Sequence, residues 1–275
     1  QAEGSGASGL DTAGADARHD DGISASVPLP RDRTHRVHVG NVEVGGGAPV
    51  AVQSMLSCST EDPQACISQI ESLVGAGCEI VRLAIPRAEA LDGVSQVCEA
   101  SPIPVVADIH FDYRLALGAI ARGASKLRIN PGNIGSAKKV DAVIEAAGEA
   151  GIPIRIGVNA GSLELKLRDK EGWTLAEKLV ESARHSVEHF ENRGFRDIVV
   201  SAKAHDVVQT VETYRLLSRE MPSLPLHIGI TEAGTIRQGT VKSAVGLGML
   251  LGQGIGDTMR VSLTGDVTEE VRVAS

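Results

Sequence analysis

The chain has 275 residues, of which 42% are hydrophobic and 23% charged, and its formal net charge is −8. This length allows one barrel-sized domain or two smaller ones. The acidic balance, with only one Trp, two Tyr and three Phe, argues against nucleic acid as a partner. Nucleic acid needs a broad basic surface, and single strands also need aromatic stacking platforms. A small phosphorylated ligand stays compatible, because a local cluster of cations can exist on an acidic protein.

The four cysteines follow no metal-binding spacing. Cys58, Cys66, Cys78 and Cys98 are irregularly spaced and contain no C-x-x-C pair. This pattern predicts neither a zinc nor an iron–sulfur site and favours buried or idle thiols in a reducing compartment. No apolar stretch reaches the roughly 18 to 20 residues that cross a bilayer. We expect a cytoplasmic bacterial protein, with a plastid location as the open alternative.

The amino-terminal part divides into a lead-in and a hairpin. Residues 1–28 are rich in Gly, Ala, Ser and Asp and lack an apolar period, which predicts a disordered segment. Residues 34–50 hold two short alternating stretches around Gly40-Asn41, a hairpin signal. We expect this hairpin to close the lower mouth of a domain that spans residues 29–275.

From residue 50 onward, apolar segments alternate regularly with amphipathic ones. Eight strands alternating with helices favour an α/β fold of the TIM-type (β/α)8 barrel class over an open doubly wound sheet. After the eighth strand only TEEVRVAS remains, which predicts a truncated last helix. The expected strands are 50–55, 78–86, 104–110, 125–130, 153–158, 197–203, 225–231 and 258–263. The expected helices follow Asp62 and then cover 87–100, 112–122, 136–150, 174–193, 206–220 and 240–253.

Each expected strand ends in polar or charged side chains, which a parallel barrel gathers at one rim. Residues two apart share a face of a strand, so Asp108 lies beside His110, and Arg128 beside Asn130. Cations outnumber acids at these ends, which predicts an anionic ligand and favours a diphosphate. The cations are Arg82, Arg128, Arg155, Lys203 and Arg260, and the other rim residues are Gln53, Asp108, His110, Asn130, Asn159, His227, Thr231 and Glu232.

Two structural alternatives compete with an anion site. The cations could pair with carboxylates of neighbouring strands, but Asp108 and Glu232 are the two candidate acids, and unpaired buried charge is costly. A metal held by Asp108, His110 and His227 is less favoured, because the surrounding Arg and Lys would repel a cation.

Glycine-rich turns, one glutamate and two histidines complete the expected rim. INPGNIG, GVNAGS and GITEAG follow three of the strands; such turns let backbone N–H groups approach phosphate oxygens, or serve as ordinary tight turns. Glu232 is the candidate general acid, or alternatively the partner of Arg260 or Lys203. His110 and His227 could orient a phosphate or carry a proton.

Several long segments resemble the 4-hydroxy-3-methylbut-2-enyl diphosphate synthase family (IspG, also called GcpE) of the non-mevalonate isoprenoid pathway. They include VGNVEVGGGAPVAVQSM, PVVADIHFDYRLAL, LRINPGNIG, IPIRIGVNAGSLE and VKSAVGLGMLLGQGIGDTMRVSL. The resemblance implies an oxidoreductase whose barrel binds 2-C-methyl-D-erythritol 2,4-cyclodiphosphate and whose reaction opens the ring with two electrons. It makes the five cations phosphate ligands and Glu232 a proton donor. It also implies supporting polar contacts from Asn130, Asn159, His110, Thr231 and Ser262.

The chain departs from this family at Leu56 and His205, neither of which belongs to the anion-binding set. The family also holds a 4Fe–4S cluster on cysteines of a second domain, and no segment of this chain matches those ligands. We therefore expect an iron–sulfur domain in trans or missing from this sequence, with the chain alone inactive. The resemblance further implies a homodimer of the full enzyme and ferredoxin or flavodoxin as electron donor. The alternatives are a non-catalytic diphosphate-binding module and a transferase barrel like dihydropteroate synthase.

Overall fold

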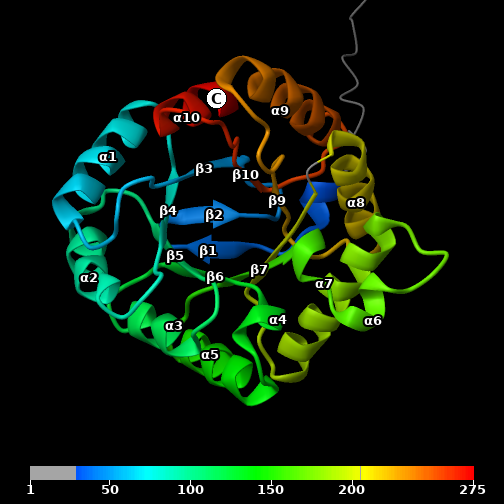
Figure 1. Cartoon of the computed structure of the whole chain (residues 1–275), viewed down its shortest axis with the longest axis horizontal. Coiled ribbons are helices and arrows are strands. Elements are labelled where there is room, and N and C mark those ends of the chain that lie inside the picture. The colour runs from blue at the N-terminus through cyan, green and yellow to red at the C-terminus, as the bar shows by residue number, and fades with distance from the viewer. Residues whose placement is uncertain (1–28, 205) are drawn as a thin grey trace, which may run out of the picture.

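The computed structural model describes residues 29–204 and 206–275. The expected disordered segment 1–28 and the departure at His205 lie outside the described residues. Within them, eight parallel strands form one sheet in the order β8-β7-β6-β5-β4-β3-β10-β9, with helices around the outside (Figure 1). The backbone N–H of Val200 donates to the Pro225 carbonyl and Val200 bridges Leu226, which joins β8 to the β9 side and closes the barrel. The expected TIM-type architecture is therefore confirmed.

The strands agree with the expected positions, although the last two are shorter. They are β3 (Ala51–Met55), β4 (Ile80–Ala84), β5 (Val105–Ile109), β6 (Lys126–Ile129), β7 (Ile154–Asn159), β8 (Ile198–Lys203), β9 (His227–Ile228) and β10 (Thr258–Met259). Beyond β9 and β10 the rim residues continue as loops, and the backbones come close there, since a Cβ on Gly229 would lie 2.6 Å from the Arg260 carbonyl oxygen.

The outer helices begin at the side chains that the sequence offers as caps. Asp62 accepts from the Ala65 N–H, and Thr174 and Glu177 form a reciprocal capping box, which satisfies amide groups left free at a helix start. These helices are α1 (Pro63–Gly75), α2 (Ala90–Ala100), α3 (Tyr113–Ile120), α5 (Ala137–Ala150), α7 (Leu175–Asn192), α8 (Val207–Glu220), α9 (Ile236–Leu251) and α10 (Val267–Ala274).

Short helical turns in the loops were not expected from the sequence. They are η1 (Pro30–Arg33), α4 (Pro131–Ile134), η2 (Ala160–Ser162) and α6 (Leu165–Arg168). They are too short to show an apolar period. The last helix, expected to be truncated, is present as α10 with eight residues. In the described part of the chain, no helix is both long and apolar enough to cross a membrane.

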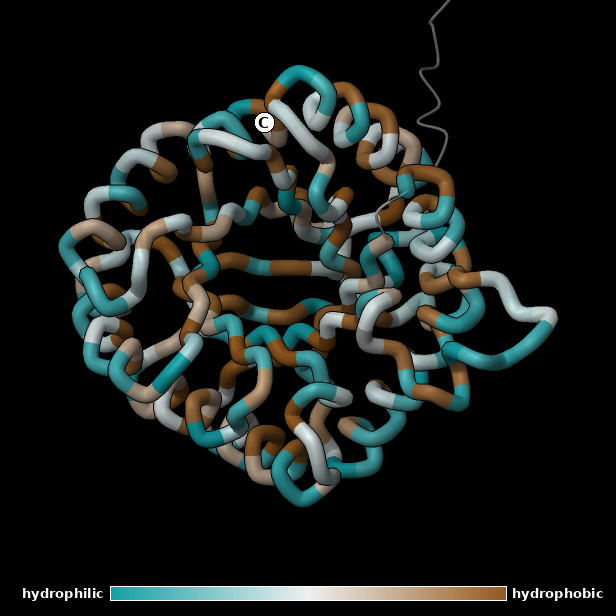
Figure 2. Tube along the Cα trace, in the orientation of Figure 1, coloured by the Kyte–Doolittle hydropathy of each residue, from teal (hydrophilic) through white to brown (hydrophobic). Residues whose placement is uncertain are grey.

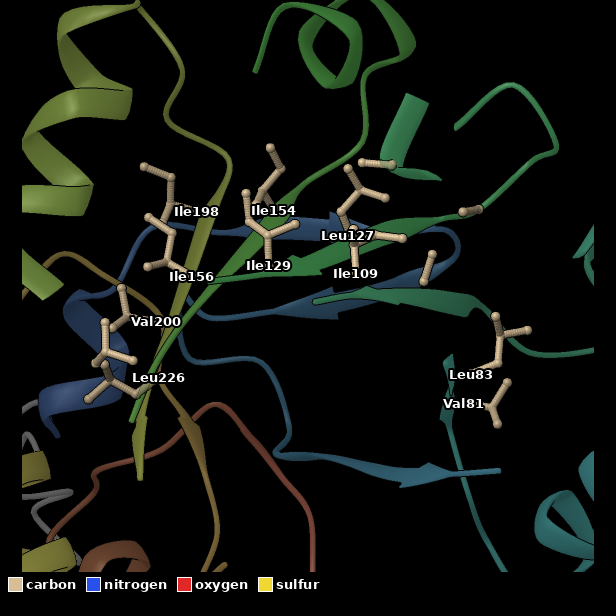
Figure 3. Close-up of a cluster of buried hydrophobic side chains, with 14 of the residues drawn as sticks. Val81, Leu83, Ile109, Leu127, Ile129, Ile154, Ile156, Ile198, Val200 and Leu226 are labelled. Atoms are coloured by element: carbon tan, nitrogen blue, oxygen red, sulfur yellow. The ribbon is translucent and has the colours of Figure 1, made fainter. Parts of the chain in front are cut away.

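One apolar layer separates the sheet from the helices. Alternate strand residues point outward and pack against the helices, among them Ile109, Ile129, Ile156 and Val200 (Figure 3). In Figure 2 the hydrophobic colour accordingly concentrates on the strands and on the inner sides of the helices. This layer consists mainly of aliphatic residues, with Phe190, Phe195 and Tyr214 among them.

The expected hairpin closes one end of the barrel. β1 (Val37–Val39) and β2 (Val42–Val44) pair antiparallel around Gly40, whose φ of 56° suits glycine, and they cross the centre of the ring (Figure 1). Their side chains pack against inward residues at the start of the strands. This second cluster, the lower plug, contains Val37, Val39, Val44, Ala51, Ile80, Val106 and Val199.

Candidate active site

A cavity of about 450 Å³ opens at the carboxyl ends of the strands. Ten of the thirteen residues expected at the site line it, and they come from seven of the eight strands or the loops that follow them. The ten are Arg82, Asp108, His110, Arg128, Arg155, Asn159, Lys203, Thr231, Arg260 and Ser262. Residues up to 180 positions apart in the sequence therefore meet around one cavity, because parallel strands place their carboxyl ends at one rim.

Asp108 is the anionic centre of one side of the cavity. Its carboxylate is 3.0 Å from Arg128 Nη1, 3.5 Å from Arg82 Nε and 3.4 Å from His110 Nε2. Burial alone would raise the pKa of this carboxyl, but the hydrogen bond from His110 and the charges of Arg82 and Arg128 hold it well below its usual range. Asp108 therefore stays ionised and orients two guanidinium groups toward the cavity.

Arg260 has a carboxylate partner that the sequence interpretation missed. Glu270, on α10 and 3% exposed, accepts from Arg260 Nε at 3.2 Å and from Nη2 at 3.1 Å. It also accepts from the Leu263 N–H at 3.0 Å. Asp108 and Glu232 were the two acids expected to pair with the rim cations. The structure instead pairs Arg82 and Arg128 with Asp108, and Arg260 with Glu270. Glu270 was missed because nothing in the sequence of α10 indicates that this helix packs close to Arg260.

Two further cations carry charge that no ion pair described above neutralises. Arg155 is 1% exposed, and its Nε and Nη1 have no hydrogen-bond partner among the described residues. Burial, then the charges of Arg82 and Arg128, lower its pKa well below the usual value. Lys203 is partly exposed at the cavity wall, and burial, followed by the charges of Arg155 and Arg82, lowers its pKa well below the usual value. The cavity is therefore electropositive and short of anions.

Glycines make room for two of the cationic side chains. A Cβ on Gly157 would lie 2.9 Å from Arg128 Nε, and a Cβ on Gly229 would lie 2.9 Å from Lys203 Nζ. Both contacts are closer than real Cβ atoms show. Because these glycines have no side chains, the Arg128 guanidinium and the Lys203 ammonium can lie close to the backbone of the barrel wall.

Three expected site residues do not line the cavity. Asn130 caps α4 by accepting from the Gly132 N–H at 3.1 Å. His227 is fully buried inside the barrel, its Nδ1 is 3.5 Å from Thr258 Oγ1, and burial with the charges of Arg155 and Lys203 lowers its pKa. Glu232 is exposed on the loop after β9 with a φ of 50°, a conformation that non-glycine residues adopt rarely and often at functional sites. Its role as an acid stays a prediction.

Four lining residues were not predicted for the site: Met55, Phe111, Asn133 and Ser201. Met55 Sδ is 2.8 Å from Arg82 Nη2 and 3.6 Å from Arg260 Nη1, so a thioether spaces the two guanidinium groups. Ser201 lies two residues before Lys203 on β8, and the period of two would have found it. Phe111 is 71% exposed, and its position beside His110 is the one signal that the sequence carries for it.

The described residues do not fit an iron–sulfur cluster. They contain no group of three or more His, Cys, Asp or Glu side chains that could hold a metal ion. Burial raises the pKa of Cys78 and of Cys98 to about 11, which disfavours the thiolate that a metal needs. No chemical step through such a cluster can be derived from these cysteines.

The barrel is similar to solved structures of another enzyme class. Dihydropteroate synthase from Yersinia pestis matches with a TM-score of 0.62 at 15% sequence identity, covering 86% of this chain and 95% of that one. Dihydropteroate synthase from Stenotrophomonas maltophilia matches with a TM-score of 0.61 at 14% identity, covering 82% and 90%. At such low identity, these likenesses concern the fold alone.

The sequence comparisons are far more specific. A relative from Anoxybacillus flavithermus is 53% identical over 246 residues, covering 90% of this chain and 67% of its own length. A relative from Geobacter sulfurreducens is 56% identical over 241 residues, covering 88% and 68%. Both are named 4-hydroxy-3-methylbut-2-en-1-yl diphosphate synthase (flavodoxin), and this chain spans about two thirds of their length. The TIM-barrel domain of the GcpE family matches residues 34–275, and the chain therefore belongs to that family.

Proposed function

We propose that this chain is the substrate-binding barrel of an isoprenoid-pathway oxidoreductase. The substrate is 2-C-methyl-D-erythritol 2,4-cyclodiphosphate, and the product of its reductive ring opening is 4-hydroxy-3-methylbut-2-enyl diphosphate. The observation that carries the proposal is the convergence of five cations on one cavity in which carboxylates pair with three of them. The names of the relatives support the same substrate class.

The cations divide into two kinds. Arg82, Arg128 and Arg260 are oriented by carboxylates, so they present fixed N–H groups to phosphate oxygens with little reorganisation. Arg155 and Lys203 carry the uncompensated charge, and a bound diphosphate supplies the missing anion. Because the arginine side chains are largely buried, each of these contacts is stronger than it would be in water.

The polar residues around the cations orient the rest of the ligand. Asn159, Thr231 and Ser262 line the cavity and offer hydrogen bonds to phosphate or hydroxyl oxygens. We assign the proton that the departing oxygen needs to Glu232, which would have to turn inward from its exposed loop. Its left-handed backbone conformation is the observation that supports this assignment.

The ring opening consumes two electrons, which the described residues do not deliver. We assign this supply to an iron–sulfur domain that works together with the barrel, in trans or on the same polypeptide. The names of the relatives support flavodoxin as the electron donor. We also propose that the full enzyme is a homodimer.

The test is calorimetric titration of the barrel with the cyclodiphosphate. We expect saturable binding at one site per chain, and unchanged binding for Arg219→Ala, which removes an exposed arginine from the outer helix α8. Absence of binding would reject the proposal. Binding of a dihydropterin instead would favour the transferase alternative, to which the fold likeness alone points.

A second measurement separates an enzyme domain from a binding module. The iron–sulfur domain of a relative is added to the barrel with reduced flavodoxin, and product formation is followed. Turnover supports the assignment to the reductive enzyme. Binding of the cyclodiphosphate without turnover, when the same added domain works with the barrel of its own relative, identifies a non-catalytic module.

A further inference from the structure

Two thiols touch each other in the loop that follows β3. Cys58 lies on this loop (residues 56–62) and is half-buried, while Cys66 lies on α1 and is fully buried. Their sulfur atoms are 3.4 Å apart, and both are free cysteines. The sequence interpretation treated them as idle, because their spacing of eight residues matches no metal or redox motif.

Hydrogen bonds hold the two thiols in this position. The Cys66 thiol donates to the Ser59 carbonyl at 3.4 Å. Gln69 Oε1 accepts from the Ser57 N–H at 2.8 Å and is 3.5 Å from Cys58 Sγ. A disulfide needs the sulfurs about 2.05 Å apart, so the loop has to move by only about 1.4 Å to form one.

We propose that Cys58 and Cys66 are a dithiol site that reacts with a small disulfide, such as oxidised glutathione, to form an intramolecular disulfide. Cys58 loses its proton and attacks one sulfur of the reagent, whose S–S bond breaks and releases the first thiolate. Cys66 then loses its proton and attacks the Cys58 sulfur, which releases the second thiolate. The two cysteine sulfurs give up two electrons, and the reagent leaves as two thiols that take the two protons.

The order of attack follows from access and from the thiol environments. Cys58 reaches solvent, whereas burial, the hydrogen bond to Cys58 and the Cys58 charge raise the pKa of Cys66 to about 12. Once Cys58 is bound to the reagent, it no longer raises the pKa of Cys66 by its charge or by that hydrogen bond. Cys78 donates to backbone carbonyls of Val52 and Ile80, so the described structure gives it no thiol partner.

The disulfide would fix the loop that follows Met55, a residue of the cavity wall. Met55, just before the loop, touches Arg82 and Arg260. Within the loop, Thr60 donates to the Ala84 carbonyl at 2.7 Å, and Glu61 pairs with Arg87. Joining Cys58 to α1 therefore ties residues 56–62 to the helix layer and restricts their motion beside the anion site.

The experiment maps the bond in the full chain. The protein is treated with oxidised glutathione, the remaining thiols are alkylated, and the chain is cleaved after Glu61, which separates Cys58 from Cys66. We expect the two fragments to stay joined with the loss of two hydrogen atoms, and dithiothreitol to release them. Cys98→Ser should behave the same, while Cys58→Ser and Cys66→Ser should leave the fragments separate.

Hydrogen exchange of the backbone amides 56–62 gives the second readout. We expect these amides to exchange several-fold more slowly in the oxidised chain than in the reduced one, with no change at the lower plug. Glutathione that stays on Cys58 while Cys66 remains alkylatable would overturn the proposal, as would unchanged exchange in an oxidised chain. Both readings use the unsubstituted protein, so they do not depend on how the variants fold.

Discussion

The two ends of the barrel interior are built from the same strands but have opposite character. On β4, buried Ile80 belongs to the lower plug, and Arg82, two residues later, lines the cavity. On β5 the same step leads from Val106 to Asp108. Since residues two apart on a strand lie about 6.6 Å from one another, the interior changes from apolar to ionic within one inward step.

This contrast separates what stabilises the fold from what serves the ligand. The lower plug buries aliphatic groups, and that burial favours folding. The rim encloses cations that repel one another and are only partly paired, which costs folding free energy. Substitutions at the rim should therefore weaken binding without lowering stability, whereas substitutions at the lower plug should lower stability without weakening binding.

Replacing Arg155 with Met should have the largest effect on binding. The loss of a buried charge contact costs about 2 to 5 kcal/mol, so the affinity for the cyclodiphosphate should fall by more than about 30-fold. The free protein should melt at the same or a higher temperature, because an incompletely paired buried charge is removed. Calorimetry and thermal unfolding measure the two quantities.

Arg219→Ala is the matched control and should change neither value. A lower melting temperature for Arg155→Met with unchanged affinity would contradict the assignment, because Arg155 would then stabilise the barrel instead of binding the anion.

Replacing Ile80 with Ala should have the reverse effect. The side chain is fully buried in the lower plug, and truncating a buried Ile typically costs about 2 to 5 kcal/mol of the free energy of unfolding. Denaturant unfolding should show this loss. At a temperature where the variant stays folded, the affinity for the diphosphate should remain within about twofold. A large loss of affinity in the folded variant would show that the two ends are coupled.

Replacing Gly157 with Ala tests the space beside Arg128. The new methyl group would meet the flexible end of the guanidinium at 2.9 Å from Nε, so the side chain should move while the barrel persists. Since this displaces one hydrogen-bonding partner from the ligand, we expect about tenfold weaker binding, equivalent to about 1.4 kcal/mol.

Gly248→Ala is the control for that substitution, because a Cβ at Gly248 on α9 meets no atom within 4 Å. It should leave binding unchanged and stabilise the helix slightly. Equal binding for Gly157→Ala and the parent chain would mean that Arg128 does not contact the ligand in its present position.

The convergence of the strand-end cations could be predicted from the sequence, because strand ends, a period of two and parallel topology together determine which side chains meet. These three signals were sufficient to place Arg82, Arg128 and Arg260 at the rim. What it could not predict depends on segments without a period of their own. Glu270 reaches Arg260 from a two-turn helix, and Asn130 turns out to cap α4, a helix of four residues.

Contacts that involve loops could not be predicted from the sequence either. Cys58 and Cys66 meet because Asp62 starts α1 and Gln69 holds the preceding loop against it, which residue spacing does not reveal. The exposed, left-handed position of Glu232 likewise depends on the path of the loop after β9. By contrast, the lower plug was predicted from local signals, namely Gly40-Asn41 between two alternating segments.

The smallest effect expected is a change of protonation at Lys203 on binding. Burial and the nearby cations lower the pKa of this ammonium in the free barrel, and a bound polyanion should raise it again. Binding should therefore take up as much as one proton per chain, and affinity should fall as the pH rises above the pKa of the free state, by less than about tenfold per pH unit. Titrations in two buffers of different ionisation enthalpy measure this uptake directly.

Lys203→Met should abolish the uptake while residual binding remains, whereas Ile80→Ala at the lower plug should leave it intact. If the parent chain releases protons on binding, or takes up none at a pH where affinity is falling, the depressed pKa of Lys203 does not govern the pH response of the site.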